Sequence, residues 1–418
     1  MNITVTGGQR CGVTSAPSSK SHAQRLLICA GLGEHSVTLD CGDISKDIAA
    51  AASCVQTLCA EVVQLGEGVL RVRPQKKPSA GVKTLHCGES GSTLRFLIPV
   101  CGALGESVVF KMEGRLSERP LSPLGEVLTA HGMTIERRGT DLHCSGRLTG
   151  GEFEIAGNVS SQFISGLLFA LPLLDTDSRL TVTGKLESSA YIAMTENALR
   201  QSGIEFTKEN NVYTVPGGQR YRLNEACTVE GDLSNAAFFL CMGALSDEGV
   251  TVKNIPEHTS QGDRKIIDIL RRFGANVEIN GSSVTIKKEK LTACTVDAAE
   301  IPDLVPVVSV VAAAAEGDTH IINAARVRLK ESDRLMTTAT LLTTLGASVE
   351  EKPDGLIIHG GRPLHGGTVD SFNDHRIAMS AAVAACICTE PVTVTGCECV
   401  NKSFPRFWEK FNGLECRK

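Results

Sequence analysis

The chain has 418 residues, a formal net charge of −5, and 42% hydrophobic and 21% charged residues. This composition is typical of a globular protein of about two or three domains, and it excludes a disordered chain or a small disulfide scaffold. Aromatic residues make up only 4% and the charge is slightly acidic, so no nucleic-acid partner is expected. No apolar run reaches the ~18 residues of a membrane helix and the first residues lack a signal-peptide pattern, so we expect no membrane partner and a cytoplasmic location.

Sixteen cysteines are spread along the chain without a CxxC pair. The closest pairs, Cys386/Cys388 and Cys397/Cys399, fall in a helix-like and a strand-like run, whereas zinc sites usually need a wider spacing and more ligands. We therefore expect reduced cysteines that serve as small core residues of a cytosolic protein.

One pattern occurs six times along the chain. Each copy has a small polar turn, an apolar helix-like run, a Gly or acidic turn and a β-branched strand, and the copies are about 70 residues apart. They begin near Lys20, Ser90, Ser161, Ser234, Asp303 and Asp374. A second, amphipathic helix pattern follows and ends in a glycine where a left-handed cap is expected, at Gly132, Gly203, Gly274 and Gly346. Each unit therefore predicts strand–helix–strand–helix–strand, and copies must pack together to bury their faces.

Six units predict two domains of three units each. The opening strand, near residues 3–5, precedes the first complete unit and is expected to complete the last one, which makes one domain discontinuous. Gly and polar residues gather near residues 12–14 and 228–231, where we expect the chain to cross between domains. The predicted domains are residues 1–13 with 229–418, and residues 14–228.

Basic residues recur at the polar turns that precede the helices. They are Lys20, Arg25, Arg119, Lys330, Arg334, Arg376 and Lys402. Any one of them alone is expected to be a solvated surface charge. Their shared placement near helix N-termini, which carry free N–H groups and a positive dipole end, instead favours a site for phosphate or carboxylate groups.

Acidic and neutral polar residues accompany these cations. Asp303 heads an apolar helix, so it fits a helix cap as well as an acid or base. Glu331 lies beside Lys330, so it fits a surface ion pair as well as an acid or base. His375 fits a general acid and a hydrogen-bonded interior histidine equally well. The residues 160–162 (Ser-Ser-Gln) fit helix capping better than ligand binding when taken alone. The chain has no GxxxxGK[ST], GxGxxG or GxSxG motif, which argues against nucleotide-triphosphate, dinucleotide and serine-hydrolase sites.

Eight motifs together carry a resemblance to a known family. In order they are PSSKSHAQR, GESGSTLR, SERP, SSQF, IPD, KESDR, NDHR and NKSFP. Between about residues 13 and 407 the chain closely resembles the 3-phosphoshikimate 1-carboxyvinyltransferase (EPSP synthase) family of enolpyruvyl transferases. The resemblance implies an α/β (α+β) fold, a two-domain inverse α/β barrel of six βαβαββ repeats, with the active site in the cleft between the domains.

The resemblance also implies a reaction. The enolpyruvyl (carboxyvinyl) group of phosphoenolpyruvate would pass to the 5-hydroxyl of shikimate 3-phosphate with release of phosphate, in the shikimate pathway to chorismate and the aromatic amino acids. The hydroxyl attacks the enol carbon while the methylene carbon is protonated, and a tetrahedral ketal phosphate then loses phosphate and a proton. The family pattern requires no metal or organic cofactor. The two substrates are the only expected partners, and a monomer is expected.

Residue roles follow from the resemblance by matching position. Shikimate 3-phosphate would contact Lys20, Ser21, Arg25, Ser160, Ser161, Gln162, Ser188, Tyr191, Asp303 and Lys330. Phosphoenolpyruvate would contact Lys20, Gly91, Arg119, Gln162, Arg334, Arg376 and Lys402. The catalytic groups would be Asp303, as proton acceptor, with Glu331, Lys20 and His375.

The chain departs from the family pattern at three positions. Glu89 stands where many members have Asn, and it needs a cationic partner, for which Arg95 is a candidate. Arg326 stands where some members have an Asn that contacts shikimate, and Ala190 replaces a Pro.

Two other functions remain open at this point. A carboxyvinyltransferase for UDP-N-acetylglucosamine would share the fold, but residues 113–118 lack the reactive Cys of that family. A non-catalytic phosphate-binding repeat protein, or a nucleic-acid end-processing protein on a related scaffold, would need the cations but not the carboxylates Asp303 and Glu331.

Overall fold

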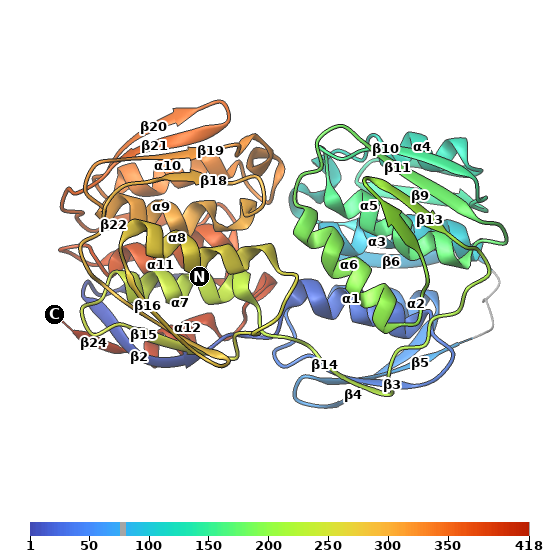
Figure 1. Cartoon of the computed structure of the whole chain (residues 1–418), viewed down its shortest axis with the longest axis horizontal. Helices are drawn as coiled ribbons and strands as arrows, with labels where there is room; N and C mark the ends of the chain where they lie inside the picture. The colour runs from blue at the N-terminus through green and yellow to red at the C-terminus, as the bar shows by residue number, and fades with distance from the viewer. Residues whose placement is uncertain (76–80, 418) are drawn as a thin grey trace. The chain divides into compact units, whose positions relative to one another are not determined.

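The computed structural model describes residues 1–75 and 81–417. The chain packs as two compact units. The discontinuous unit comprises Met1–Ser19 and Glu230–Lys418, and the continuous unit comprises Lys20–Val229. Each unit has its own hydrophobic core and three sheets (Figure 1).

The middle copy of the continuous unit displays the repeat in full. Its elements are β6 (Lys83–Gly88), α3 (Gly91–Leu104), β7 (Val108–Met112), α4 (Leu124–Ala130), β8 (Met133–Arg138) and β9 (Asp141–Gly146). Strand β6 pairs in parallel with β7, and β9 pairs antiparallel with both β7 and β8. The order β6-β7-β9-β8 is the sheet of a βαβαββ repeat. The fold class implied by the family resemblance is confirmed.

Two further copies have the same sheet order. The copy in the continuous unit consists of β10 (Glu152–Ala156), α5 (Ser161–Ala170), β11 (Ser178–Thr183), α6 (Ser189–Gln201), β12 (Thr207–Glu209) and β13 (Val212–Val215). The copy in the discontinuous unit consists of β18 (Thr295–Asp297), α9 (Val305–Ala314), β19 (Asp318–Ile322), α10 (Arg334–Thr344), β20 (Ser348–Lys352) and β21 (Gly355–His359).

The remaining copies are completed by strands from distant parts of the chain. In the continuous unit, α1 (Lys20–Gly31), β3 (Val37–Asp40), α2 (Lys46–Leu58), β4 (Ala60–Gly66) and β5 (Val69–Pro74) are joined by β14 (Ala226–Thr228). Strand β14, from the end of the unit, pairs in parallel with β3. The chain therefore returns to its starting sheet before it leaves the unit.

The discontinuous unit uses the chain termini in the same way. It contains β1 (Asn2–Val5), β2 (Gln9–Ser15), α7 (Leu233–Ala244), β15 (Val250–Lys253), α8 (Ile266–Phe273), β16 (Asn276–Asn280), β17 (Ser283–Lys287), β22 (Gly367–Asp370), α11 (His375–Ala385), β23 (Val392–Thr395), α12 (Phe407–Asn412) and β24 (Glu415–Arg417). Strand β1 pairs antiparallel with β23, so the opening strand completes the last copy as expected.

The first predicted domain boundary is wrong by a few residues. Strand β2 runs through residues 12–14, where a crossing was expected, and pairs in parallel with β15. The first unit boundary therefore falls after Ser19, not after residue 13. Gly12 marks a local backbone irregularity with a φ of 120° inside the strand, and not the end of a domain. The second boundary falls between Val229 and Glu230.

Within each unit some helices pack inside and the sheets lie outside them, as for α7 and α11, whereas others, such as α4 and α12, lie at the surface (Figure 1). All residues of α7 and α11 are buried, which explains their continuous apolar and small residues. Helix α8, the second helix of its copy, is amphipathic. The glycine that follows it, Gly274, has the expected left-handed φ of 97°. Polar residues at the ends of these inner helices are therefore held at fixed positions by a packed core.

All sixteen cysteines are free thiols and most are buried, in agreement with their expected role as core residues. Over residues 1–75 and 81–417, no helix has both the length and the apolar character required to cross a membrane.

Candidate active site

The first turns of α1 hold a buried cation whose partners are neutral. Arg25 is 2% exposed, and its Nε donates to Thr195 Oγ1 (2.9 Å). Its Nη1 and Nη2 donate to the carbonyl oxygens of Ser21 (2.6 Å) and Tyr191 (2.8 Å). Burial lowers the pKa of Arg25 to about 10, so the guanidinium is still charged at neutral pH. Among the described residues, no carboxylate pairs with this cation, which makes it a strong candidate for binding an anionic ligand.

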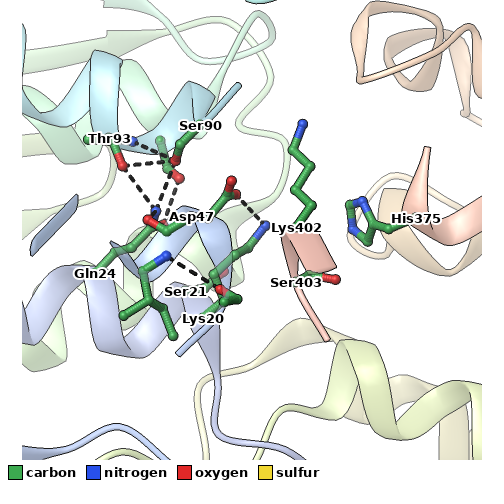
Figure 2. A network of polar contacts seen from close by, with 12 residues as sticks. Lys20, Ser21, Gln24, Asp47, Ser90, Thr93, His375, Lys402 and Ser403 are labelled. Atoms are coloured by element: carbon green, nitrogen blue, oxygen red, sulfur yellow. Dashed lines mark hydrogen bonds and ion pairs between the residues drawn. The ribbon is translucent and has the colours of Figure 1, made fainter. Parts of the chain in front are cut away.

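Lys20 begins the same helix and forms an ion pair with a residue that the sequence patterns did not mark. Its Nζ lies 3.0 Å from Asp47 Oδ2 in the first turn of α2 (Figure 2). The two side chains are 16% and 6% exposed. Gln24, one turn along α1, donates to the Asp47 carbonyl (3.2 Å). Asp47 therefore orients Lys20 and offsets part of its charge.

The turn before α3 brings two arginines against a glycine. Ser90 caps the helix, since its Oγ accepts from the amide of Thr93. A Cβ on the next residue, Gly91, would lie 2.6 Å from Arg119 Nη1 and 3.1 Å from Arg95 Nη1. The Nε of Arg119 is buried and has no hydrogen-bond partner among the described residues. A side chain here would therefore require the guanidinium groups to move, because they occupy the space beside Gly91.

The starts of α5 and α6 supply the neutral polar groups. Ser160 Oγ accepts from the Gln162 amide (3.3 Å), so the capping interpretation holds for Ser160. The side chain of Gln162 accepts from Arg95 Nη1 (2.8 Å). Ser188 is 3% exposed and has a φ of 53°, a left-handed conformation that is uncommon outside glycine. Such strain often marks a functional position. Arg95 also donates to the Pro120 carbonyl (3.0 Å), and the suggested Glu89–Arg95 pair stays a prediction.

In the discontinuous unit, Arg334 lies at the centre of three carboxylates. Its side chain is 1% exposed, and its Nε lies 2.8 Å from Asp374 Oδ2. Its Nη1 is 2.6 Å from Asp303 Oδ1, and its Nη2 is 2.7 Å from Glu331 Oε2. Burial disfavours this charge, but the three carboxylates together raise the pKa of Arg334. Asp374, identified from the sequence only as a repeat marker, is thus part of the cluster.

Asp303 is surrounded by cations and is not a helix cap. It lies in η4 (Pro302–Leu304), whose cap position is occupied by Ile301 without a side-chain bond. Besides Arg334, it pairs with Lys330 Nζ (3.5 Å) and with Arg376 Nη2 (3.4 Å). Burial disfavours the ionised form, but these cations together hold the pKa of Asp303 well below its ordinary value. Its carboxylate is therefore ionised at neutral pH.

Glu331, His375 and Lys402 complete this cluster. Glu331 is 12% exposed and its Oε1 lies 3.7 Å from Lys402 Nζ, so the surface-pair interpretation of Glu331 is wrong. The His375 ring is 1% exposed, with its Nδ1 3.8 Å from Asp374 Oδ1, which places it among buried charges. Arg326 donates to the carbonyl of Ala299 (3.1 Å), which lies shortly before Asp303 in the sequence.

One further buried acid was missed by the sequence analysis. Asp263 lies in η3 (Gly262–Lys265) and is 4% exposed. Burial, together with the negative charge of Asp303, raises the pKa of Asp263 to about 7. No motif marks such a group, because its shift arises from tertiary neighbours. Over the described residues, no group of His, Cys, Asp and Glu is arranged to hold a metal ion.

The predicted site residues thus form two groups, one in each unit. The continuous unit supplies Lys20, Ser21, Arg25, Gly91, Arg119, Ser160, Ser161, Gln162, Ser188 and Tyr191. The discontinuous unit supplies Asp303, Lys330, Glu331, Arg334, His375, Arg376 and Lys402. The first group is cationic and rich in hydroxyl groups, and the second joins ionised carboxylates to cations. These are the residue types that bind multiply charged anions and move protons.

The family model for EPSP synthase (3-phosphoshikimate 1-carboxyvinyltransferase) matches residues 6–411. The chain belongs to the EPSP synthase family. It is 42% identical over 411 residues to the 3-phosphoshikimate 1-carboxyvinyltransferase of Clostridium acetobutylicum, which covers 96% of this chain and 95% of that protein. It is 40% identical over 406 residues to that of Clostridium kluyveri, with the same coverage of 96% and 95%. The solved EPSP synthase of Acinetobacter baumannii superposes over the full length of both chains, with a TM-score of 0.81 and 25% identity.

Family membership gives the two groups their context. A transferase that joins two anionic substrates needs cations to offset their repulsion, and it needs an acid and a base for the proton transfers. The buried Arg25 and the ionised Asp303 match these needs.

Proposed function

We propose that the protein transfers the enolpyruvyl group of phosphoenolpyruvate to the 5-hydroxyl of shikimate 3-phosphate and releases phosphate. The observation that carries this proposal is Arg25, a buried guanidinium whose hydrogen-bond partners among the described residues are a hydroxyl and two carbonyl groups. Such a cation is prepared for a bidentate anion. Near-full-length similarity to 3-phosphoshikimate 1-carboxyvinyltransferases supports the choice of substrates.

The continuous unit contributes most of the shikimate 3-phosphate site in this proposal. Arg25 and Ser21 bind the substrate from α1, with Lys20 beside them. The N-terminal turn of α5 offers Ser160, Ser161 and Gln162, and Ser188 and Tyr191 lie at the start of α6. The free amide groups and dipole of a helix N-terminus favour a phosphate group at α5.

Phosphoenolpyruvate is assigned to the cations around Gly91. Arg119 has a buried Nε available for an acceptor, and the absence of a side chain at Gly91 lets both arginines approach the helix. Arg334, Arg376, Lys402 and Gln162 complete the proposed contacts, as in the family pattern. Arg334 differs from Arg119 in that its N–H groups already bind three carboxylates, so it acts chiefly by orienting them.

Asp303 is the proposed proton acceptor. As the C–O bond forms at the enol carbon, the proton of the 5-hydroxyl passes to the ionised Asp303, and an acid protonates the methylene carbon. Lys20, Glu331 and His375 are the candidates for the transfers at carbon. In the second step the bond to phosphate breaks and the new methyl group loses a proton. Orienting the two substrates contributes up to about 7–11 kcal/mol in favourable cases.

We further propose that both residue groups act on one pair of substrates. Each unit carries only part of the expected residue set, which supports this arrangement. A single chain contains all six repeats, so a monomer suffices for activity. The unpaired cysteines fit a reducing compartment, and we propose the cytoplasm.

The test is phosphate release from phosphoenolpyruvate, with shikimate 3-phosphate or UDP-N-acetylglucosamine as acceptor. Release only with shikimate 3-phosphate is expected. Release only with the nucleotide sugar, or with neither, would overturn the assignment.

A second test addresses the base. Asp303→Asn should lower kcat by at least about 100-fold, the lower range for a general base, while shikimate 3-phosphate still binds. Asn is preferable to Ala because it keeps an acceptor for the buried Arg334. An unchanged kcat would remove Asp303 from the proton transfer.

A further inference from the structure

Gln24 joins three elements that carry the candidate site in the continuous unit. It lies on α1 and is 1% exposed. Its Nε2 lies 3.2 Å from the Asp47 carbonyl on α2, 3.0 Å from Ser90 Oγ and 3.1 Å from Thr93 Oγ1 at the start of α3 (Figure 2). Its Oε1 accepts from Ser92 Oγ (2.6 Å). One amide group thus holds two other helices.

Both hydrogens of this amide are used. Nε2 carries two hydrogens and faces three acceptors, so at least one hydrogen is shared between two of them. Ser90 and Thr93 also bond to each other through their hydroxyl oxygens (2.8 Å). The first turn of α3 is therefore held from both sides, by the nitrogen of Gln24 and by its oxygen.

Of the two helices that Gln24 holds, α2 carries the ion-pair partner of a proposed substrate contact, and α3 begins at another proposed contact, Gly91. Asp47, whose carbonyl it binds, forms the ion pair with Lys20 Nζ at 3.0 Å. Gly91 lies inside the turn that it fixes, against the guanidinium of Arg119. Gln24 itself is buried beneath this turn and touches neither cation in the bonds described above.

We propose that Gln24 is a positioning residue for phosphoenolpyruvate, which sets the α3 turn at Gly91 in register with the Lys20–Asp47 pair. This inference rests on the proposed function. A side chain of the same size without hydrogen bonds would fill the space but would remove one donor from two buried hydroxyl groups and from a carbonyl. The turn would then be free to shift relative to Lys20.

The experiment compares Gln24→Leu with Gln64→Leu as a matched control. Gln64 is exposed on strand β4, and its side chain donates to the Gly66 carbonyl (3.1 Å). In Gln24→Leu we expect the KM for phosphoenolpyruvate to rise about tenfold, which corresponds to about 1.4 kcal/mol. The KM for shikimate 3-phosphate should stay within about twofold, since Arg25 and the start of α5 are not held by this amide. Gln64→Leu should match the wild type.

A second variant covers the case in which Gln24→Leu does not fold. Ser92→Ala removes one bond to Gln24, and the KM for phosphoenolpyruvate should rise by about threefold, a typical value for one hydrogen bond. If Gln24→Leu folds and keeps the wild-type KM values, the positioning role of Gln24 is overturned. If only Ser92→Ala folds, wild-type KM values in that variant would overturn it. So would an equal rise of both KM values. If the wild type itself releases no phosphate, the proposed function fails. If the wild type is active and the variant matches it, only the role of Gln24 fails.

Discussion

Replacing Thr195 with valine tests whether a buried hydroxyl orients Arg25 for its ligand. Thr195 is 0% exposed, and its Oγ1 accepts from Arg25 Nε (2.9 Å) and donates to Ser165 Oγ (2.7 Å). Valine has nearly the same shape but no acceptor. Loss of a hydrogen bond to a charged group costs about 1.5–3 kcal/mol, which should appear as a lower free energy of unfolding.

The effect on binding is smaller and can be separated from stability. Without Thr195 the guanidinium must be ordered when the ligand binds, at a cost of about 0.5–1.5 kcal/mol for one side chain. This cost corresponds to a rise of about two- to twelvefold in the KM for shikimate 3-phosphate. The KM for phosphoenolpyruvate should not change, because the contacts of Arg119 and Gly91 do not involve Thr195.

Steady-state kinetics with one substrate saturating, together with urea denaturation, measure both quantities. Thr195→Ser keeps the acceptor and is the matched control, with kinetics close to those of the wild type. A folded Thr195→Val enzyme with an unchanged KM for shikimate 3-phosphate would refute the reasoning. An equal change in both KM values would also refute it.

Three further predictions concern other parts of the chain. Gly91→Ala would place a Cβ 2.6 Å from Arg119 Nη1, so the arginine must move. The KM for phosphoenolpyruvate should then rise by about tenfold or more, and an unchanged KM in steady-state kinetics would contradict this. Burial and the charge of Asp303 raise the pKa of Asp263 to about 7 from an ordinary value of 3.8, so the native state binds a proton that the unfolded state releases between these values, and stability from this group falls as pH rises across that range. Urea denaturation should therefore show Asp263→Asn gaining stability relative to the wild type between about pH 5 and pH 8, whereas a constant difference would contradict the shift. A thiol reagent should react rapidly with Cys416, the one exposed cysteine within residues 1–75 and 81–417, and slowly with the buried thiols. Rapid reaction of most thiols in the native protein would contradict this burial.

The repeat could be predicted from the sequence, and the candidate site residues were proposed from it. Helix starts, apolar runs and cap glycines are local features, since a helix contact joins residues three or four positions apart. Gly274 illustrates this, because its left-handed conformation follows from its place after an amphipathic run. The family motifs add residues such as Arg25 and Asp303, whose types already indicate anion binding and proton transfer.

What the tertiary structure decided is how these residues are paired. Arg25 bonds to Thr195 across 170 positions of sequence, and Gln24 bonds to Ser90 across 66. Local patterns carry no information on such pairs, because they depend on which helices the sheets bring together. The same holds for the charge states: Asp263 titrates near neutral pH and Asp303 does not, although both are buried aspartates. The difference comes from the cations around Asp303, since a buried carboxylate stays ionised only where neighbouring positive charges outweigh the loss of water.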